Sequence, residues 1–127
     1  MTLISIIIGK KGINLDTTNL LCSSYYLYKY FYFQQNSIKE LCHFIARNTF
    51  YRIDNNDLKY YYHKNFYFMT LIIDNICICA ILDNDEYQIS SLRRLLKDIL
   101  DQFINQNSIL IKNSYKDFCL DFPNKFK

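Results

Sequence analysis

The sequence contains very little glycine and proline, with two glycines and one proline among 127 residues. Glycine-rich phosphate-binding loops and proline-rich linkers are therefore absent, and nothing in the composition divides the chain into parts. This length is typical of one domain with a core of its own, so we expect a single domain over residues 1–127. Half of the residues are hydrophobic, which excludes general disorder.

Long hydrophobic runs, a secretion signal and a disulfide framework are also missing. The longest apolar run is far shorter than the ~20 residues that a helix needs to cross a bilayer. The first residues show neither a basic start nor a small-residue cleavage site. The five cysteines are odd in number, and Cys77 and Cys79 lie inside an apolar run. We therefore expect reduced thiols in the core of a cytosolic protein.

Strong charge of one sign is lacking too. The net charge is only +3, and acidic residues are mixed among the basic ones. This argues against a dedicated nucleic-acid-binding protein but allows weak attraction to anionic membranes. The tyrosine run 60–62, followed by His63 and Lys64, resembles a stacking platform for bases, yet a half-buried strand is the commoner meaning of such a run. We expect no nucleic-acid partner.

The most informative stretch is Leu71–Phe103. Within it, Ile76–Leu82 is apolar at every position, as in a strand that is covered on both faces. A polar turn follows at 83–87, and apolar residues then recur with the period of an amphipathic helix over 89–103. A buried strand is thus predicted to lead into a long helix that packs back onto the sheet.

The other elements follow from similar patterns. Strands are expected over Leu3–Ile8, Asn19–Tyr28, Leu58–Tyr62, Phe66–Ile73 and Ile76–Leu82. Asp74-Asn75 is expected to form a tight hairpin turn. Helices are expected from a capping box at Ser37 and Glu40 to about Arg52, over 89–103, and over Ile109–Phe122.

These elements follow the order ββαβββαα and predict an α+β fold. The first and last strands are apolar on both faces and belong in the middle of the sheet, whereas the third strand carries Lys59 and belongs at an edge. We therefore expect a five-stranded, mainly antiparallel sheet with strand order 2-1-5-4-3. One helix should lie on one face and two on the other.

On the first helix, one apolar side chain stands apart from the buried stripe. At ~100° per residue, that stripe comprises Ile38, Leu41, Cys42, Ile45 and Thr49. Glu40, His43 and Arg47 are expected on the opposite, solvated face. Phe44 falls on the shoulder of the stripe, where it either packs under the margin of the sheet or forms an exposed apolar patch.

The element order and three stretches resemble the longin domain, the N-terminal regulatory module of R-type SNAREs of the synaptobrevin class. The stretches are FYFQQNSIKELCHFIARNT, ICICAILDNDEYQISSLRRLLKDILDQF and SYKDFCLDFPN. The resemblance covers essentially the whole chain and is closest to the lipid-anchored, prenylated branch of the family. It departs at Gln88, where many relatives have proline. It implies a profilin-like longin fold.

The resemblance also implies a non-catalytic regulatory and targeting domain in vesicle trafficking and membrane fusion. Such a domain folds back on its own SNARE segment or on the attached prenyl lipid and holds the protein closed. The implied partners are the protein's own SNARE motif, cognate SNAREs and a lipid, at the cytoplasmic side of Golgi, endosomal or vesicle membranes. The implied groove between the first helix and the edge strand comprises Ile38, Leu41, Phe44, Ile45, Leu58, Tyr60 and Tyr62.

The chain contains neither a heptad-patterned SNARE segment nor a C-terminal cysteine motif. We expect it to be the regulatory domain of a longer SNARE, and the alternative is a free-standing longin-like subunit of a tethering or coat complex. The downstream coding sequence would separate the two. No nucleophile–base set, phosphate loop or set of metal ligands is visible, so we expect no enzyme, no metal and no cofactor.

Overall fold

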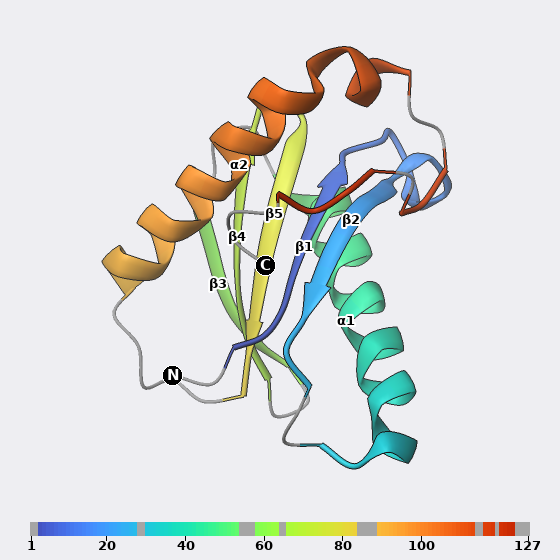
Figure 1. Cartoon of the computed structure of the whole chain (residues 1–127), viewed down its shortest axis with the longest axis vertical. Coiled ribbons are helices and arrows are strands. Elements are labelled where there is room, and N and C mark those ends of the chain that lie inside the picture. Colours follow the sequence, from blue (N-terminus) through green and yellow to red (C-terminus); the bar gives the residue numbers. More distant parts are fainter. Residues whose placement is uncertain are drawn as a thin grey trace.

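The computed structural model describes residues 3–27, 30–53, 58–63, 66–83, 89–113, 116–118 and 120–123, with the backbone alone for 58–63. The elements are β1 (Leu3–Lys10), the short 3-10 helix η1 (Leu15–Thr17), β2 (Asn19–Tyr25), α1 (Tyr32–Arg52), β3 (Leu58–His63), β4 (Phe66–Ile73), β5 (Ile76–Leu82) and α2 (Ile89–Lys112). The predicted α+β class is confirmed, because one sheet lies between two long helices (Figure 1).

The sheet is antiparallel throughout, and its strand order is β2-β1-β5-β4-β3. This is the order expected from the sequence. All residues of β5 are buried, and in β1 only the two end residues are not. Both strands therefore need cover on both faces, which only the middle of the sheet provides. β3, which carries Lys59, lies at one edge and β2 at the other.

The hairpin between β4 and β5 turns at Asp74 and Asn75. Both residues have positive φ, 50° and 67°. Asp and Asn tolerate this left-handed conformation, and a two-residue hairpin turn requires it. Ile73 pairs with Ile76 directly beside the turn, so the register of the hairpin is fixed there. The predicted turn and the predicted bounds of both strands are confirmed.

Side-chain alternation places a separate apolar cluster on each face of the sheet. In β5, Cys77, Cys79 and Ile81 face α1, whereas the alternate residues face α2. The predicted burial of the two cysteines on one face is confirmed. Burial raises the pKa of the Cys79 thiol and of the Cys42 thiol on α1 to about 12. These thiols are therefore protonated packing residues and not nucleophiles.

The first helix begins earlier than the sequence indicated. The predicted capping box at Ser37 and Glu40 is wrong, since α1 starts at Tyr32 and both residues lie inside it. Phe31 occupies the N-cap position, and its backbone N–H donates to the Gln34 side chain at 3.4 Å. The Gln34 N–H in turn donates to the Phe31 carbonyl at 2.9 Å, so Gln34 makes both hydrogen bonds with the N-cap residue. The predicted end at Arg52 is confirmed.

The predicted third helix over Ile109–Phe122 is wrong. α2 continues through the polar residues 105–108 to Lys112, with a kink at Asn107, whose side chain donates to the Phe103 carbonyl at 3.0 Å. Asn107 itself has non-helical dihedral angles, φ −129° and ψ 18°, so the helical backbone is interrupted at this residue. Beyond Lys112, residue 113 and the described residues from 116 to 123 form turns, bends and extended backbone. The second face is therefore covered by α2 with its kink at Asn107, within the stretch where the sequence predicted a break, and the described residues beyond Lys112 form no further helix.

Two adjacent lysines at the end of β1 hold the C-terminal ends of both helices. Lys10 Nζ donates to the carbonyls of Ile111 and Lys112 at 3.2 and 3.4 Å. Lys11 Nζ donates to the carbonyl of Ile53, which directly follows α1. The last carbonyls of a helix lack partners within the helix and carry partial negative charge. Each lysine therefore fixes the end of one helix to the sheet.

Candidate functional site

One side of α1 is buried against the sheet. Its buried residues are Cys42, Ile45, Ala46 and Phe50, and the helix packs on β1, β2 and β5. The helix comes close to the sheet at Gly9 of β1, where an added Cβ would lie 2.6 Å from the Phe50 ring. A side chain at Gly9 would thus push the helix away. The helix therefore has a fixed position, with one flank toward β2 and one flank away from it.

The flank away from β2 carries the predicted docking residues. Phe44 is 57% exposed, which favours the exposed patch over packing under the sheet margin. Ile38 and Leu41 are partly buried against the cluster beneath α1. We call Ile38, Leu41 and Phe44 the docking ridge. Ile45 is buried in the core, so it supports this ridge from below instead of lining an open surface.

The other three predicted residues belong to the edge strand β3. The backbones of Leu58, Tyr60 and Tyr62 pair with those of Leu71, Met69 and Tyr67 of β4, respectively. The side chains of these β3 residues lie outside the described part of the chain. The edge position is the one expected for a strand that accepts an extended peptide along its free side.

The opposite flank of α1 faces β2 and is covered by the C-terminal strap, residues 116–118 and 120–123. The strap passes beside β2 (Figure 1) and bonds to its backbone: Phe118 N–H donates to the Leu20 carbonyl at 2.5 Å and Leu120 N–H to the Leu21 carbonyl at 3.1 Å. Phe122 is buried in the cluster beneath α2. The strap therefore covers part of an edge strand that would otherwise face solvent.

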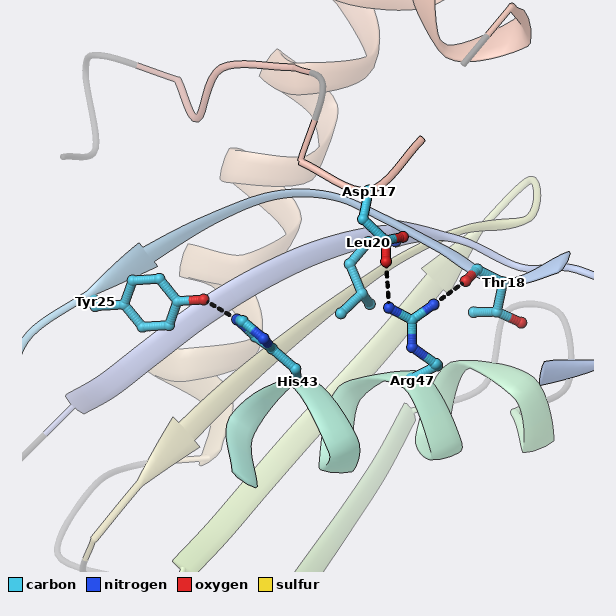
Figure 2. Close-up of polar contacts among 6 residues, drawn as sticks. All are labelled: Thr18, Leu20, Tyr25, His43, Arg47 and Asp117. Carbon is cyan, nitrogen blue, oxygen red and sulfur yellow. Dashed lines mark hydrogen bonds and ion pairs between the residues drawn. The ribbon is translucent and has the colours of Figure 1, made fainter. Parts of the chain in front are cut away.

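Arg47 and Asp117 join α1, β2 and the strap. Arg47 Nη2 lies 2.5 Å from Asp117 Oδ2, and Arg47 Nη1 donates to the Thr18 carbonyl at 2.5 Å (Figure 2). The other oxygen of Asp117, Oδ1, accepts from the Leu20 N–H at 3.0 Å. One guanidinium and one carboxylate thus connect three segments that are far apart in the sequence, with charge-assisted bonds on both side chains.

His43 lies under the strap, one turn before Arg47. Its Nε2 shares a hydrogen bond with the Tyr25 hydroxyl (Figure 2), and its ring centroid is 4.8 Å from that of Phe118. Burial lowers the pKa of His43, and the charge of Arg47 lowers it further, while the nearby carboxylates act in the opposite direction. Burial also raises the pKa of Tyr25. Both shifts favour the neutral forms, in which the phenol donates a hydrogen bond and the imidazole Nε2 accepts it.

A hollow of about 410 Å³ lies between α1, β2 and the strap. Lys39 and His43 of α1, Tyr25 of β2, and Phe118 and Asp121 of the strap line it. The Lys39 ammonium lies 5.0 Å from the Tyr25 ring centroid, in a cation–π contact. Because a lysine and an aspartate both border the hollow, its charge favours neither anions nor cations.

The prediction that His43 and Arg47 are solvated residues on the polar face is wrong, because both are half-buried and bonded to other elements. The predicted stripe omitted Ala46 and Phe50, which extend the buried surface toward β2. Their apolar character was a signal that the sequence offered. Nothing in the local sequence indicated that Asp117, seventy positions from Arg47, would be its partner. Glu40 is exposed, as expected.

Two further properties bear on the site. Among the described residues, no three His, Cys, Asp or Glu side chains gather closely enough to hold a metal ion. None of the helices described has both the length and the apolar composition that a bilayer span requires.

No protein-family model matches the chain, and a search of curated proteins gave no match either. A functional proposal therefore has to be argued from the fold and its surfaces.

Proposed function

We propose that this chain is the regulatory longin domain of an R-type SNARE, and that its docking ridge binds the SNARE segment of the same protein or an attached prenyl group. The observation that carries the proposal is the strand order β2-β1-β5-β4-β3 with α1 and α2 on opposite faces. This arrangement agrees with the profilin-like longin fold that the sequence resembles. The proposal covers vesicle trafficking and membrane fusion, without a catalytic step.

The exposure of Phe44 supports docking at the ridge. A phenylalanine that is 57% exposed leaves apolar surface in water, and Leu41 and Ile38 extend that surface along the helix. Full burial of such a side chain stabilises a complex by ~1.5–3 kcal/mol. An amphipathic segment or a prenyl chain has the apolar surface to provide that burial. The edge strand β3, on which three of the predicted groove residues lie, supplies the second wall in the proposal.

The proposal includes one departure from the family pattern. A longin domain would carry a third helix on the face of α2, and the described residues beyond α2 are not helical. The strap takes part of that role, because Leu120 and Phe122 pack against the cluster beneath α2. The resemblance in architecture therefore depends on the sheet and the two long helices.

In the proposed closed state, the docked segment cannot pair with cognate SNAREs, so docking lowers the rate of complex assembly. The proposed place of action is the cytoplasmic side of Golgi, endosomal or vesicle membranes, where the full-length protein would be peripheral. Release of the segment would leave the ridge uncovered, as in the structure described.

The test is a titration of the ¹⁵N-labelled chain followed by amide chemical shifts. The two probes are a peptide with the sequence of a synaptobrevin-class SNARE segment and S-farnesylcysteine methyl ester. At least one probe should shift the amides of Ile38, Leu41 and Phe44. Phe44→Ala should weaken that binding about tenfold, because an anchoring aromatic at an interface is worth ~1.4 kcal/mol or more.

The matched control is Ile109→Ala, which removes a 73% exposed apolar side chain from α2. It should leave binding unchanged. Shifts confined to residues away from the ridge, or equal binding by the chain and Phe44→Ala, would contradict docking at the ridge. The absence of shifts with both probes would overturn the regulatory proposal.

A further inference from the structure

The N-terminal end of α1 carries three consecutive exposed aromatic residues. Phe31, Tyr32 and Phe33 are 71%, 87% and 78% exposed. Each such side chain has ~150–250 Å² of surface, so together they leave roughly 350–600 Å² in water. That equals the largest apolar patch of a typical monomer, and patches of this size often mark interaction sites. We call these three residues the aromatic tip.

Two rings of the aromatic tip lie against each other at an end of the molecule. The Phe31 and Phe33 rings are stacked, with centroids 5.7 Å apart and planes 6° from parallel. In Figure 1 the first turn of α1 lies at the lower end of the long axis, away from the sheet. Because the three side chains are mostly exposed, they project from this end of the molecule into solvent. A projection of aromatic rings can enter a soft, planar phase, whereas small ligands bind in concave sites.

The sequence around the tip carries no negative charge. Asp16 and Glu40 are the nearest acidic residues on either side, and the only charged residues between them are Lys29 and Lys39. Anionic phospholipids give membrane surfaces a negative potential that attracts such segments. Exposed aromatic rings in a segment whose only charged side chains are basic suit the interface of an anionic membrane.

We propose that the aromatic tip inserts into the interface of a bilayer that contains anionic phospholipid. Phe31 and Phe33 would reach the boundary of the acyl chains, and the Tyr32 hydroxyl would stay at the level of the headgroups, as tyrosine does in membrane-interface belts. One tip of this size gives a weak, reversible contact that adds to another anchor. The inference needs only the tip and is independent of the proposed SNARE function.

The tip and the docking ridge can act at the same time. Phe33 and Phe44 are eleven positions apart on α1, so they are separated by ~16 Å along the helix axis. A segment docked at the ridge would therefore leave the tip free. The two proposals also fail separately, since Phe44→Ala should not change membrane binding.

The chain contains no tryptophan, so Tyr32→Trp introduces a single fluorophore at the tip. The probe is a vesicle of phosphatidylcholine and phosphatidylserine, compared with a vesicle of phosphatidylcholine alone. We expect a blue shift of the emission and quenching by brominated acyl chains with the mixed vesicles, and a smaller change without phosphatidylserine. Ile109→Trp is the matched control on α2, and its emission should not change.

Sedimentation with the same vesicles gives the second measurement. Replacement of both Phe31 and Phe33 by serine should lower the vesicle-bound fraction at least about fivefold, because two apolar side chains no longer enter the bilayer. Both residues are exposed, so the fold should persist, and circular dichroism checks this. Unchanged Tyr32→Trp emission, an equal shift for Ile109→Trp, or wild-type sedimentation of the double variant would each overturn the proposal.

Discussion

The two flanks of α1 differ in what covers them. On the flank toward β2, the polar residues His43 and Arg47 are half-buried and bonded to β2 and the C-terminal strap. On the other flank, Phe44 is mostly exposed. Polar residues are usually more exposed than apolar ones, so His43, Arg47 and Phe44 depart from the common pattern, although the buried stripe of α1 is apolar as usual. The β2 flank is therefore a structural joint, and the Phe44 flank leaves apolar surface exposed, which is where we propose that a partner docks.

The largest expected effect comes from comparing two phenylalanines of the same helix. Phe50→Ala should lower the free energy of unfolding by ~3–5 kcal/mol, because Phe50 is fully buried and a cavity would remain. Phe44→Ala should change it by less than ~0.5 kcal/mol. Urea denaturation measures both values. Similar losses for the two variants would show that Phe44 is part of the core and would contradict its proposed role.

A smaller loss is expected where α1 approaches the sheet. Gly9→Ala would place a Cβ 2.6 Å from the Phe50 ring and 2.9 Å from the Asn19 carbonyl oxygen. Such overpacking should cost ~1–3 kcal/mol of unfolding free energy. In a Phe50→Leu background the cost should shrink, since the smaller side chain removes part of the clash, and a double-mutant cycle measures this coupling. Strictly additive losses would mean that the contact with Phe50 is not the cause of the destabilisation by Gly9→Ala.

The joint on the β2 flank should contribute less. Arg47 and Asp117 are about one third exposed, at 31% and 36%, so solvent screens their attraction. We expect a coupling of ~0.5–1 kcal/mol in a double-mutant cycle of Arg47→Met and Asp117→Asn, decreasing as salt is added. A coupling near zero would show that the bonds to the Thr18 carbonyl and the Leu20 N–H hold the strap without the ion pair.

The smallest expected effect is a pH dependence due to His43. Burial lowers its pKa in the folded chain below the ordinary value of 6.5. The unfolded chain then binds the proton more readily, so the stabilisation is complete above pH 6.5 and decreases as the pH falls below it. Urea midpoints on both sides of that pH should show this decrease in the wild type and a smaller one in His43→Gln. The same pH dependence in both would exclude His43 as its source.

Local signals were sufficient to predict the sheet. Asp74 and Asn75 specify their own turn because their side chains tolerate positive φ, and the apolar run Ile76–Leu82 requires burial on both faces whatever surrounds it. The edge position of the third strand followed from Lys59. For this reason the strand order could be derived without knowledge of any contact between distant residues.

The errors arose where distant contacts decide the outcome. The pattern around Asp117 resembles a helix, yet its carboxylate is held by Arg47 and by the Leu20 N–H, and the backbone follows β2 instead. Phe118 adopts a positive φ of 56°, which is unfavourable for a large side chain and is held here by its bond to Leu20. Helix geometry placed Phe44 on the shoulder of the buried stripe but left both packing and exposure open, and its exposed fraction of 57% decides for exposure.

Lys10 and Lys11 attach the helices on both faces of the sheet to the same end of β1. Each lysine holds the final carbonyls of a different helix, and both leave the chain at the same end of β1. A slip of β1 by one residue against its neighbours would send each ammonium to the wrong face and release both helices together. The helices never need to touch each other to respond jointly, because any displacement of this strand end reaches the two sides of the molecule at once.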